Sequence, residues 1–139
     1  MTYEPREYRT TIALLRVVGP HWIEIHYDSG IMFQPEAVAE VQAKRRELMG
    51  ASPYVTLTLI PKDVDYHMNT MSRDQGKADR GESQLLASAV VVKASMIEML
   101  TRLYLSSFPQ LQRTLVTHDE GTARAWLEEQ LRMGLASAG

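Results

Sequence analysis

The chain has 139 residues, of which 45% are hydrophobic and 23% are charged, and its formal net charge is −2. These values are typical of one globular domain, and the charge argues against binding to nucleic acid, which normally needs a basic stripe. The absence of cysteine excludes disulfides, thiol catalysis and cysteine-bound metals. The charged N-terminus is not a secretory signal, and no apolar run approaches the roughly 20 residues of a membrane span. We therefore expect a cytoplasmic protein without a transmembrane segment.

The first half of the chain predicts a hairpin, a helix and a third strand. Residues 10–18 are rich in β-forming residues, Gly19-Pro20 interrupts the run, and residues 21–27 alternate in polarity. Two such segments joined by a short turn are typical of an antiparallel hairpin. A helix is predicted over residues 35–49, where Pro35 suits the first turn. Residues 54–60 predict the third strand.

The second half continues the alternation of strands and helices. Residues 61–84 are the least regular part of the chain, with a weakly helical stretch near residues 66–73. Residues 85–93 predict a fourth strand, and their Val90-Val91-Val92 core indicates burial on both faces. A further helix is predicted from Ser95, which forms a capping-box pattern with Glu98, to about Ser107.

The last third predicts a strand that leads directly into an amphipathic helix. Residues 111–117 form the strand, and Thr117 and Glu120 have the spacing of a capping box. Helical periodicity separates the following residues into two groups. The inner group is Ala123, Trp126, Leu127 and Leu131, and the outer group is Arg124, Glu128, Glu129 and Arg132.

The predicted order is β-β-α-β-α-β-α-β-α, which indicates an α/β protein with a mixed five-stranded sheet. We expect the helices to pack mainly on one face of this sheet. The opposite face is expected to be partly solvated and to carry Arg16, Glu24, His26, Thr56 and Thr58. Residues 1–9 are expected to form an N-terminal extension, and residues 10–139 a single domain.

This order resembles the STAS domain, the SpoIIAA-like fold of bacterial anti-sigma-factor antagonists. More narrowly, the chain resembles small bacterial STAS/Sec14-like proteins of unknown function, in which an acidic cap and an Ala-x-x-Trp-Leu helix follow the final strand. The matching segments here are Val116-Thr-His-Asp-Glu120 and Ala123-Arg-Ala-Trp-Leu127, and the resemblance covers residues 10–133.

One departure from the antagonists concerns the segment after the third strand. In the antagonists an Asp-Ser pair there carries the serine that is phosphorylated to block partner binding. The present chain has Asp63 and Asp65 with no adjacent serine, and Thr70 and Ser72 follow a turn or more later. These four residues are the candidate regulatory loop that the resemblance implies, but the departure argues against a phosphorylation switch of the same kind.

Few residues suggest chemistry. Glu24 and His26 share one face of the second strand, with Arg16 opposite, and cross-strand charge pairing explains this cluster as well as catalysis does. Asp63 and Asp65 could form a carboxylate pair, although solvated turn residues are the simpler interpretation. No histidine pair has metalloprotease spacing, and no phosphate-binding loop is visible. We therefore predict no catalytic residues, no metal and no cofactor.

The helix over residues 95–107 has an apolar surface wider than packing on a sheet requires. Met99, Tyr104 and Leu105 are its candidate partner-contacting residues, and a second copy of the chain is a candidate partner. Alternatively, the segment 66–84 folds over this surface. The favoured function is a non-enzymatic regulatory or protein-interaction module, acting as a homodimer. The alternatives are a carrier of a small apolar or lipid-like ligand, and an enzyme that uses Glu24/His26 or Asp63/Asp65.

Overall fold

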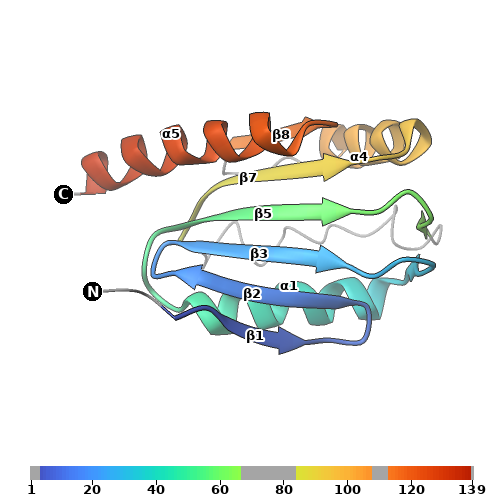
Figure 1. Ribbon diagram of the computed structural model, residues 1–139, viewed down its shortest axis with the longest axis horizontal. Helices are drawn as coiled ribbons and strands as arrows, with labels where there is room; N and C mark the ends of the chain where they lie inside the picture. The colour runs from blue at the N-terminus through green and yellow to red at the C-terminus, as the bar shows by residue number, and fades with distance from the viewer. Residues whose placement is uncertain (1–3, 67–83, 108–112, 139) are drawn as a thin grey trace.

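A computed structural model describes residues 4–66, 84–107 and 113–138, which form one six-stranded mixed sheet with helices on both faces (Figure 1). In spatial order the strands are β1 (Arg6–Arg9), β2 (Ala13–Gly19), β3 (Trp22–Tyr27), β5 (Tyr54–Ile60), β7 (Leu85–Val92) and β8 (Arg113–Thr117). The strands from β1 to β3 pair antiparallel, and those from β3 to β8 pair parallel. The helices are α1 (Pro35–Met49), α4 (Ser95–Ser107) and α5 (Glu120–Ala138). A separate parallel pair consists of β4 (Met32–Phe33) and β6 (Asp65–Tyr66).

The five predicted strands and the α/β fold class are confirmed, but the sheet has six strands. Residues 6–9, expected in an N-terminal extension, form the additional strand β1, in which Arg6 is the cross-strand partner of Val17. Its sequence, Arg-Glu-Tyr-Arg, shows no apolar face because β1 lies at the edge of the sheet and is largely exposed. Charged residues are common on such edges, since they discourage pairing with other chains.

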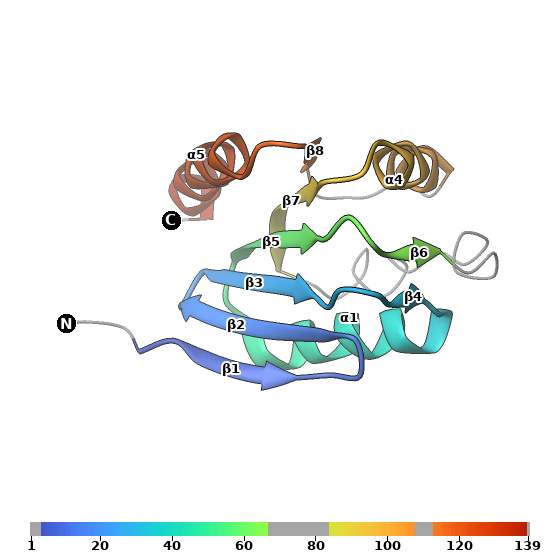
Figure 2. The ribbon, with the colours of Figure 1, turned by 45° about the vertical axis from the view of Figure 1, so that its right-hand side comes forward.

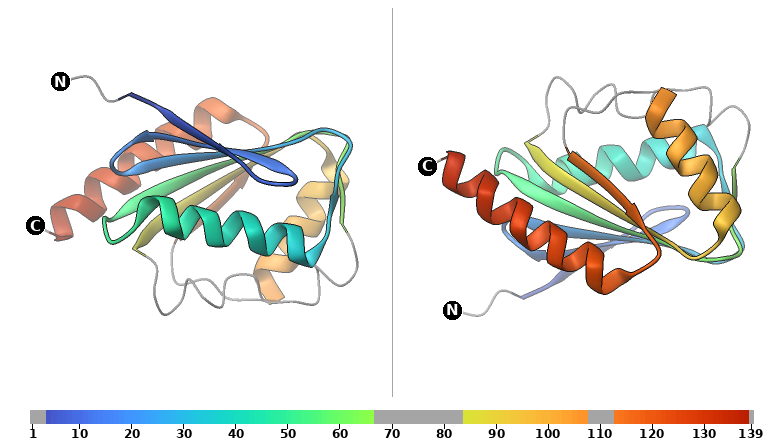
Figure 3. Two further views of the ribbon diagram at one scale, coloured as in Figure 1. Left: turned by 90° about the horizontal axis from the view of Figure 1, so that it is seen from below. Right: turned by 90° about the horizontal axis from the view of Figure 1, so that it is seen from above.

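The helices divide between the two faces of the sheet (Figures 2 and 3). Helices α1 and α4 lie on one face, as expected, whereas α5 lies on the opposite face, and for α5 the expectation was wrong. On the α1 face, Val41 and Ile97 join a core with Leu15, Ile23 and Ile25. On the α5 face, Ala123 and Leu127 are fully buried in a second core, whose strand residues are Val55, Leu57, Ala87, Ala89 and Val91.

The two threonines of β5 lie on the helix-covered face that carries α1, not with Arg16, Glu24 and His26 as predicted. In the register of β3 and β5, Thr56 is paired with Ile23, and Glu24 is paired with Leu57. Thr56 is only 2% exposed. The alternation within β5 was predicted correctly, but β5 is a central strand covered on both faces, so its threonine face is not the solvated one.

The start of α5 also differs from the prediction. Asp119, rather than the Thr117–Glu120 pair, caps the helix, because its Oδ2 accepts a hydrogen bond of 2.9 Å from the backbone N–H of Thr122. Hydrogen bonds from the hydroxyl and backbone of Thr122 hold the pKa of Asp119 below its ordinary value. In α4, the Glu98 carboxylate accepts hydrogen bonds from Arg102.

Candidate functional site

One half of the α5 face has no described helix over it. Helix α5 packs against β5, β7 and β8, and the same face of β1, β2 and β3 lies beside the helix rather than beneath it (Figure 2). We term this second region the open half-sheet. It is defined by the side chains of Glu7, Arg9, Leu14, Arg16, Glu24 and His26, which adjoin one another across the three strands.

Polarity changes sharply along a single row of cross-strand neighbours on this face. From the edge inward, Glu7 is paired with Arg16, and Arg16 with Glu24. The row then continues under α5 as Leu57, Ala89 and Leu115. The change from charged to apolar residues falls between β3 and β5, which is also where antiparallel pairing gives way to parallel pairing.

Glu24 lies at this boundary and is 5% exposed. Its Oε2 accepts a hydrogen bond from Arg124 Nη1 at 2.8 Å, and its Oε1 lies 2.9 Å from His26 Nε2. Burial alone would raise the pKa of Glu24, but the hydrogen bonds and charges of Arg124 and His26 outweigh it and lower that pKa. In turn, the hydrogen bond with Glu24 raises the pKa of Arg124, whose Nε also bonds to Glu120 at 2.9 Å.

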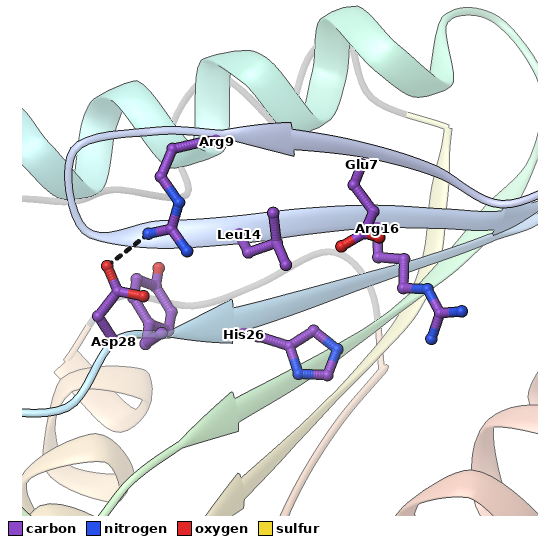
Figure 4. A pocket seen from close by; sticks show the side chains of 7 residues that line it. Glu7, Arg9, Leu14, Arg16, His26 and Asp28 are labelled. Carbon is purple, nitrogen blue, oxygen red and sulfur yellow. Dashed lines mark hydrogen bonds and ion pairs between the residues drawn. The ribbon is translucent and has the colours of Figure 1, made fainter.

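Next to this ion pair, the open half-sheet contains a pocket of about 320 Å³ (Figure 4). Its lining residues are Glu7, Arg9, Leu14, Arg16, His26, Tyr27 and Asp28. Arg9 Nη1 and Asp28 Oδ2 form an ion pair at 2.6 Å. Arg16, by contrast, is exposed, and its guanidinium makes no ion pair or hydrogen bond with any side chain in the described part of the chain. The pocket therefore offers one cation that the fold does not use.

The orientation of His26 follows from its contact with Glu24. An ionised carboxylate only accepts hydrogen bonds, so Nε2 of His26 must carry the proton that it shares with Glu24. The other ring nitrogen, Nδ1, is then left for a ligand. The lining includes no serine or threonine that His26 could activate as a nucleophile. These groups are suited to binding rather than to covalent catalysis.

The structure brings only part of the predicted site residues together. Glu24 and His26 meet as predicted. Asp63 and Asp65 are both exposed: Asp65 begins β6, and Asp63 precedes it and accepts a backbone hydrogen bond from Gly30. Thr70 and Ser72 lie outside the described residues. Met99 of α4 is 63% exposed. Tyr104 and Leu105 belong to the same helix, and their side chains lie outside the described part of the structure.

The remaining described histidines have structural contacts. His21 Nδ1 lies 2.7 Å from the carbonyl oxygen of Pro53. His118, predicted as a polar cap residue, pairs with Glu98 and lies 3.0 Å from the carbonyl oxygen of Val92. It therefore connects α4 to the ends of β7 and β8. Within the described ranges, no three acidic or histidine side chains are arranged to hold a metal ion.

Sequence reasoning missed the residue that completes the site. Arg124 lies 100 positions from Glu24, and periodicity placed it on the outer side of its helix. It lies instead at the rim of the interface between α5 and the sheet, with its side chain 37% exposed. A rim arginine can pack its stem and extend its charged group to a neighbouring strand. The only sign of this contact in the sequence was Glu24, an acidic residue in a strand whose other residues mostly favour burial.

None of the helices in the described part of the chain has the length and apolar character needed to cross a membrane. By sequence, no protein-family model and no curated protein matches the chain. By structure, it is similar to an uncharacterised protein of the DUF3478 family with a SpoIIAA-like fold from Shewanella loihica PV-4. The TM-score is 0.51 and the identity 13%, over 89% of this chain and 92% of that one. The likeness shows the fold alone: the chain has a SpoIIAA-like fold, as the sequence resemblance implied.

Proposed function

We propose that this protein is a non-enzymatic, cytoplasmic regulatory module that binds another protein through the open half-sheet. The supporting observation is the single face that is apolar under α5 and charged beside it. Arg9 is held by Asp28 and His26 by Glu24, so a partner that binds there needs to order few groups of this chain.

The same geometry ranks the alternatives. A carrier of an apolar ligand needs a largely apolar pocket, whereas the pocket on the open half-sheet is lined by five charged or titratable side chains, Glu7, Arg9, Arg16, His26 and Asp28. An enzyme would draw on the Glu24–His26 pair, but Glu24 is already neutralised by Arg124 and the lining supplies no nucleophile. Binding requires neither a nucleophile nor an enclosed cavity.

Helix α4 supports a second candidate surface, for a homodimer. Met99 exposes 63% of its area, the largest exposed fraction among the large apolar residues that the structure describes. A dimer through α4 predicts a solution mass near twice 15.7 kDa, and Met99→Asp would reduce that mass to the monomer value. A monomeric wild-type protein would rule out this dimer without affecting the proposal for the open half-sheet.

Site-specific photo-crosslinking in cells of the source organism tests the main proposal. A photoreactive amino acid replaces Leu14 on the open half-sheet, Met99 on α4, or the exposed Glu128 on α5 as a control. We expect a discrete protein adduct from position 14 that is absent from position 128. Equal labelling at both positions, or no adduct at position 14, would contradict the proposal.

Mass spectrometry of gently purified protein tests the carrier alternative. Under our proposal the protein retains only its chain mass after desalting. A stoichiometric co-purifying lipid would replace the interaction module with a carrier as the favoured function.

A further inference from the structure

Building on the proposed function, we infer that the open half-sheet recognises an acidic side chain of its partner, with the Arg16 guanidinium as the anchor. The partner presents this carboxylate on a short segment that lies across β1, β2 and β3. Three properties of the open half-sheet support this assignment: its charges, its geometry and its size.

The charges leave one positive group available. In the pocket, Arg9 is neutralised by Asp28, and beneath it Glu24 is neutralised by Arg124. Arg16 lies between Glu7 and Glu24 in the strand register, yet its guanidinium pairs with neither of them. Figure 4 shows this guanidinium extending away from Glu7. An unpaired guanidinium presents several N–H donors in one plane, which suits a carboxylate that accepts two of them.

The geometry adds a rigid frame beside Arg16. His26 lines the same pocket, and its Nε2 contact with Glu24 fixes the ring. Because Arg124 holds Glu24 in turn, the imidazole is oriented by two successive contacts. Leu14, cross-strand neighbour of both Arg9 and His26, supplies an apolar floor for the methylene groups of an acidic side chain.

The size of the surface argues for a short segment rather than for a second copy of the chain. Strands β1, β2 and β3 have 4, 7 and 6 residues. At roughly 3.3 Å per residue and about 4.8 Å between strands, they cover roughly 270 Å². A stable protein dimer usually buries about 800 Å² on each partner. The pocket volume of about 320 Å³ is at the lower end of the range for ligand sites, about 300–1,000 Å³. The area of the open half-sheet and the volume of its pocket both match one or two side chains of an extended segment.

The purified full-length chain tests this inference with N-acetyl-glutamate N-methylamide, which presents one glutamate side chain on a blocked backbone. Its glutamine counterpart is the neutral, isosteric control. We expect the charged probe to produce saturable NMR shifts at Arg16 Nε–H and at the His26 ring, with millimolar affinity. The neutral probe should produce none. Saturation by both probes, or by neither, would overturn the inference.

Two variants separate recognition from general charge effects. Arg16→Gln should weaken binding of the charged probe about tenfold, the effect of losing one charge-assisted contact. Arg132→Gln, which removes an arginine paired with Glu129 on the exposed side of α5, should leave the affinity unchanged. Equal weakening by both variants would show that net charge, rather than the Arg16 site, attracts the probe.

Inorganic phosphate serves as the competing anion. If phosphate saturates the pocket and the glutamate probe does not, the acidic side-chain assignment is wrong. The outcome is independent of the crosslinking result. If the glutamate probe binds but no partner is crosslinked, the proposed function is wrong and only an anion site remains. If a partner is still crosslinked in the Arg16→Gln variant, the proposed function stands but Arg16 is not its anchor.

Discussion

The two halves of the α5 face are made from the same sheet, and they differ in what lies above them. Under α5, the row of cross-strand neighbours is Leu57, Ala89 and Leu115, with Leu57 and Ala89 fully buried. Beside α5, the same row is Glu7, Arg16 and Glu24. The covered half stabilises the fold by removing apolar surface from water, and the open half contributes through charge and shape.

The comparison assigns different roles to the two halves. The side chains of the open half-sheet take no part in the core under α5 and are free to form a binding surface. The opposite side chains of β2 and β3, including Leu15 and Ile23, pack in the core with α1. Glu24 and Arg124 mark the border, since each has one contact toward each half.

Removing a large side chain from the covered half should have the largest effect on stability. Leu127 is fully buried, so Leu127→Ala should lower the free energy of unfolding by about 3 kcal/mol, through lost burial and a residual cavity. Leu14→Ala, on the open half, should cost less than about 1 kcal/mol because Leu14 is partly exposed. Urea titrations measure both values. Equal losses of unfolding free energy in the two variants would contradict the different roles proposed for the two halves.

Removing the charge at the border should have an intermediate effect. Glu24→Gln keeps the shape of the side chain but breaks the pair with Arg124, and we expect a loss of about 1–2 kcal/mol. Glu129→Gln is the matched control, because Glu129 pairs with Arg132 on the exposed side of α5. That change should leave the free energy of unfolding almost unchanged, because an ion pair in water contributes little to stability. If Glu129→Gln destabilises the protein as much as Glu24→Gln does, the position of Glu24 at the border between the two halves has no particular importance for stability.

The contribution of Glu24 should also depend on pH. Its pKa in the folded protein lies below the ordinary value of 4.5. The ionised form therefore stabilises the fold fully above that value, and this stability is lost as the pH falls through the lower, folded-state pKa. The difference in unfolding free energy between wild type and Glu24→Gln should accordingly narrow between about pH 6 and pH 3. A difference that stays constant or widens in acid would contradict the pairing.

Neutralising the free cation should have the smallest effect on stability. Arg16 is exposed and its guanidinium has no partner among the described side chains, so Arg16→Gln should change the free energy of unfolding by less than about 0.5 kcal/mol. The same variant is expected to weaken binding of the glutamate probe. Thermal unfolding measured beside the probe titration separates the two effects, and a large loss of stability would place Arg16 in the fold rather than in recognition.

The sequence was sufficient for most elements because their periodicity is strong. Strands β2, β3, β5, β7 and β8 and helices α1 and α4 follow the predicted ranges closely, and α5 follows β8 directly, as predicted. Strand β1 was missed because an edge strand of charged residues has no apolar alternation to detect. The two-residue strands β4 and β6 are too short to leave a pattern in the sequence.

The candidate site was only half predictable, for a different physical reason. The alternation of polarity shows which residues of one strand share a face. It does not show which residues of the neighbouring strand lie on that same face, because this depends on the register between the two strands. This is why Thr56 and Thr58 were grouped with Glu24, although Glu24 is paired with Leu57. Likewise, the helical period of α5 gave its inner stripe but not the face of the sheet that it covers, so the contact of Arg124 with Glu24 could not be foreseen.

The 100-residue separation between Glu24 and Arg124 has a consequence for synthesis of the chain. Strands β1 to β3 leave the ribosome before α5 is made, and until then the Glu24 carboxylate lacks the Arg124 guanidinium that neutralises it. The open half-sheet is thus completed only after α5 has been made, and a chain truncated before α5 would present the same three strands with a different balance of charge.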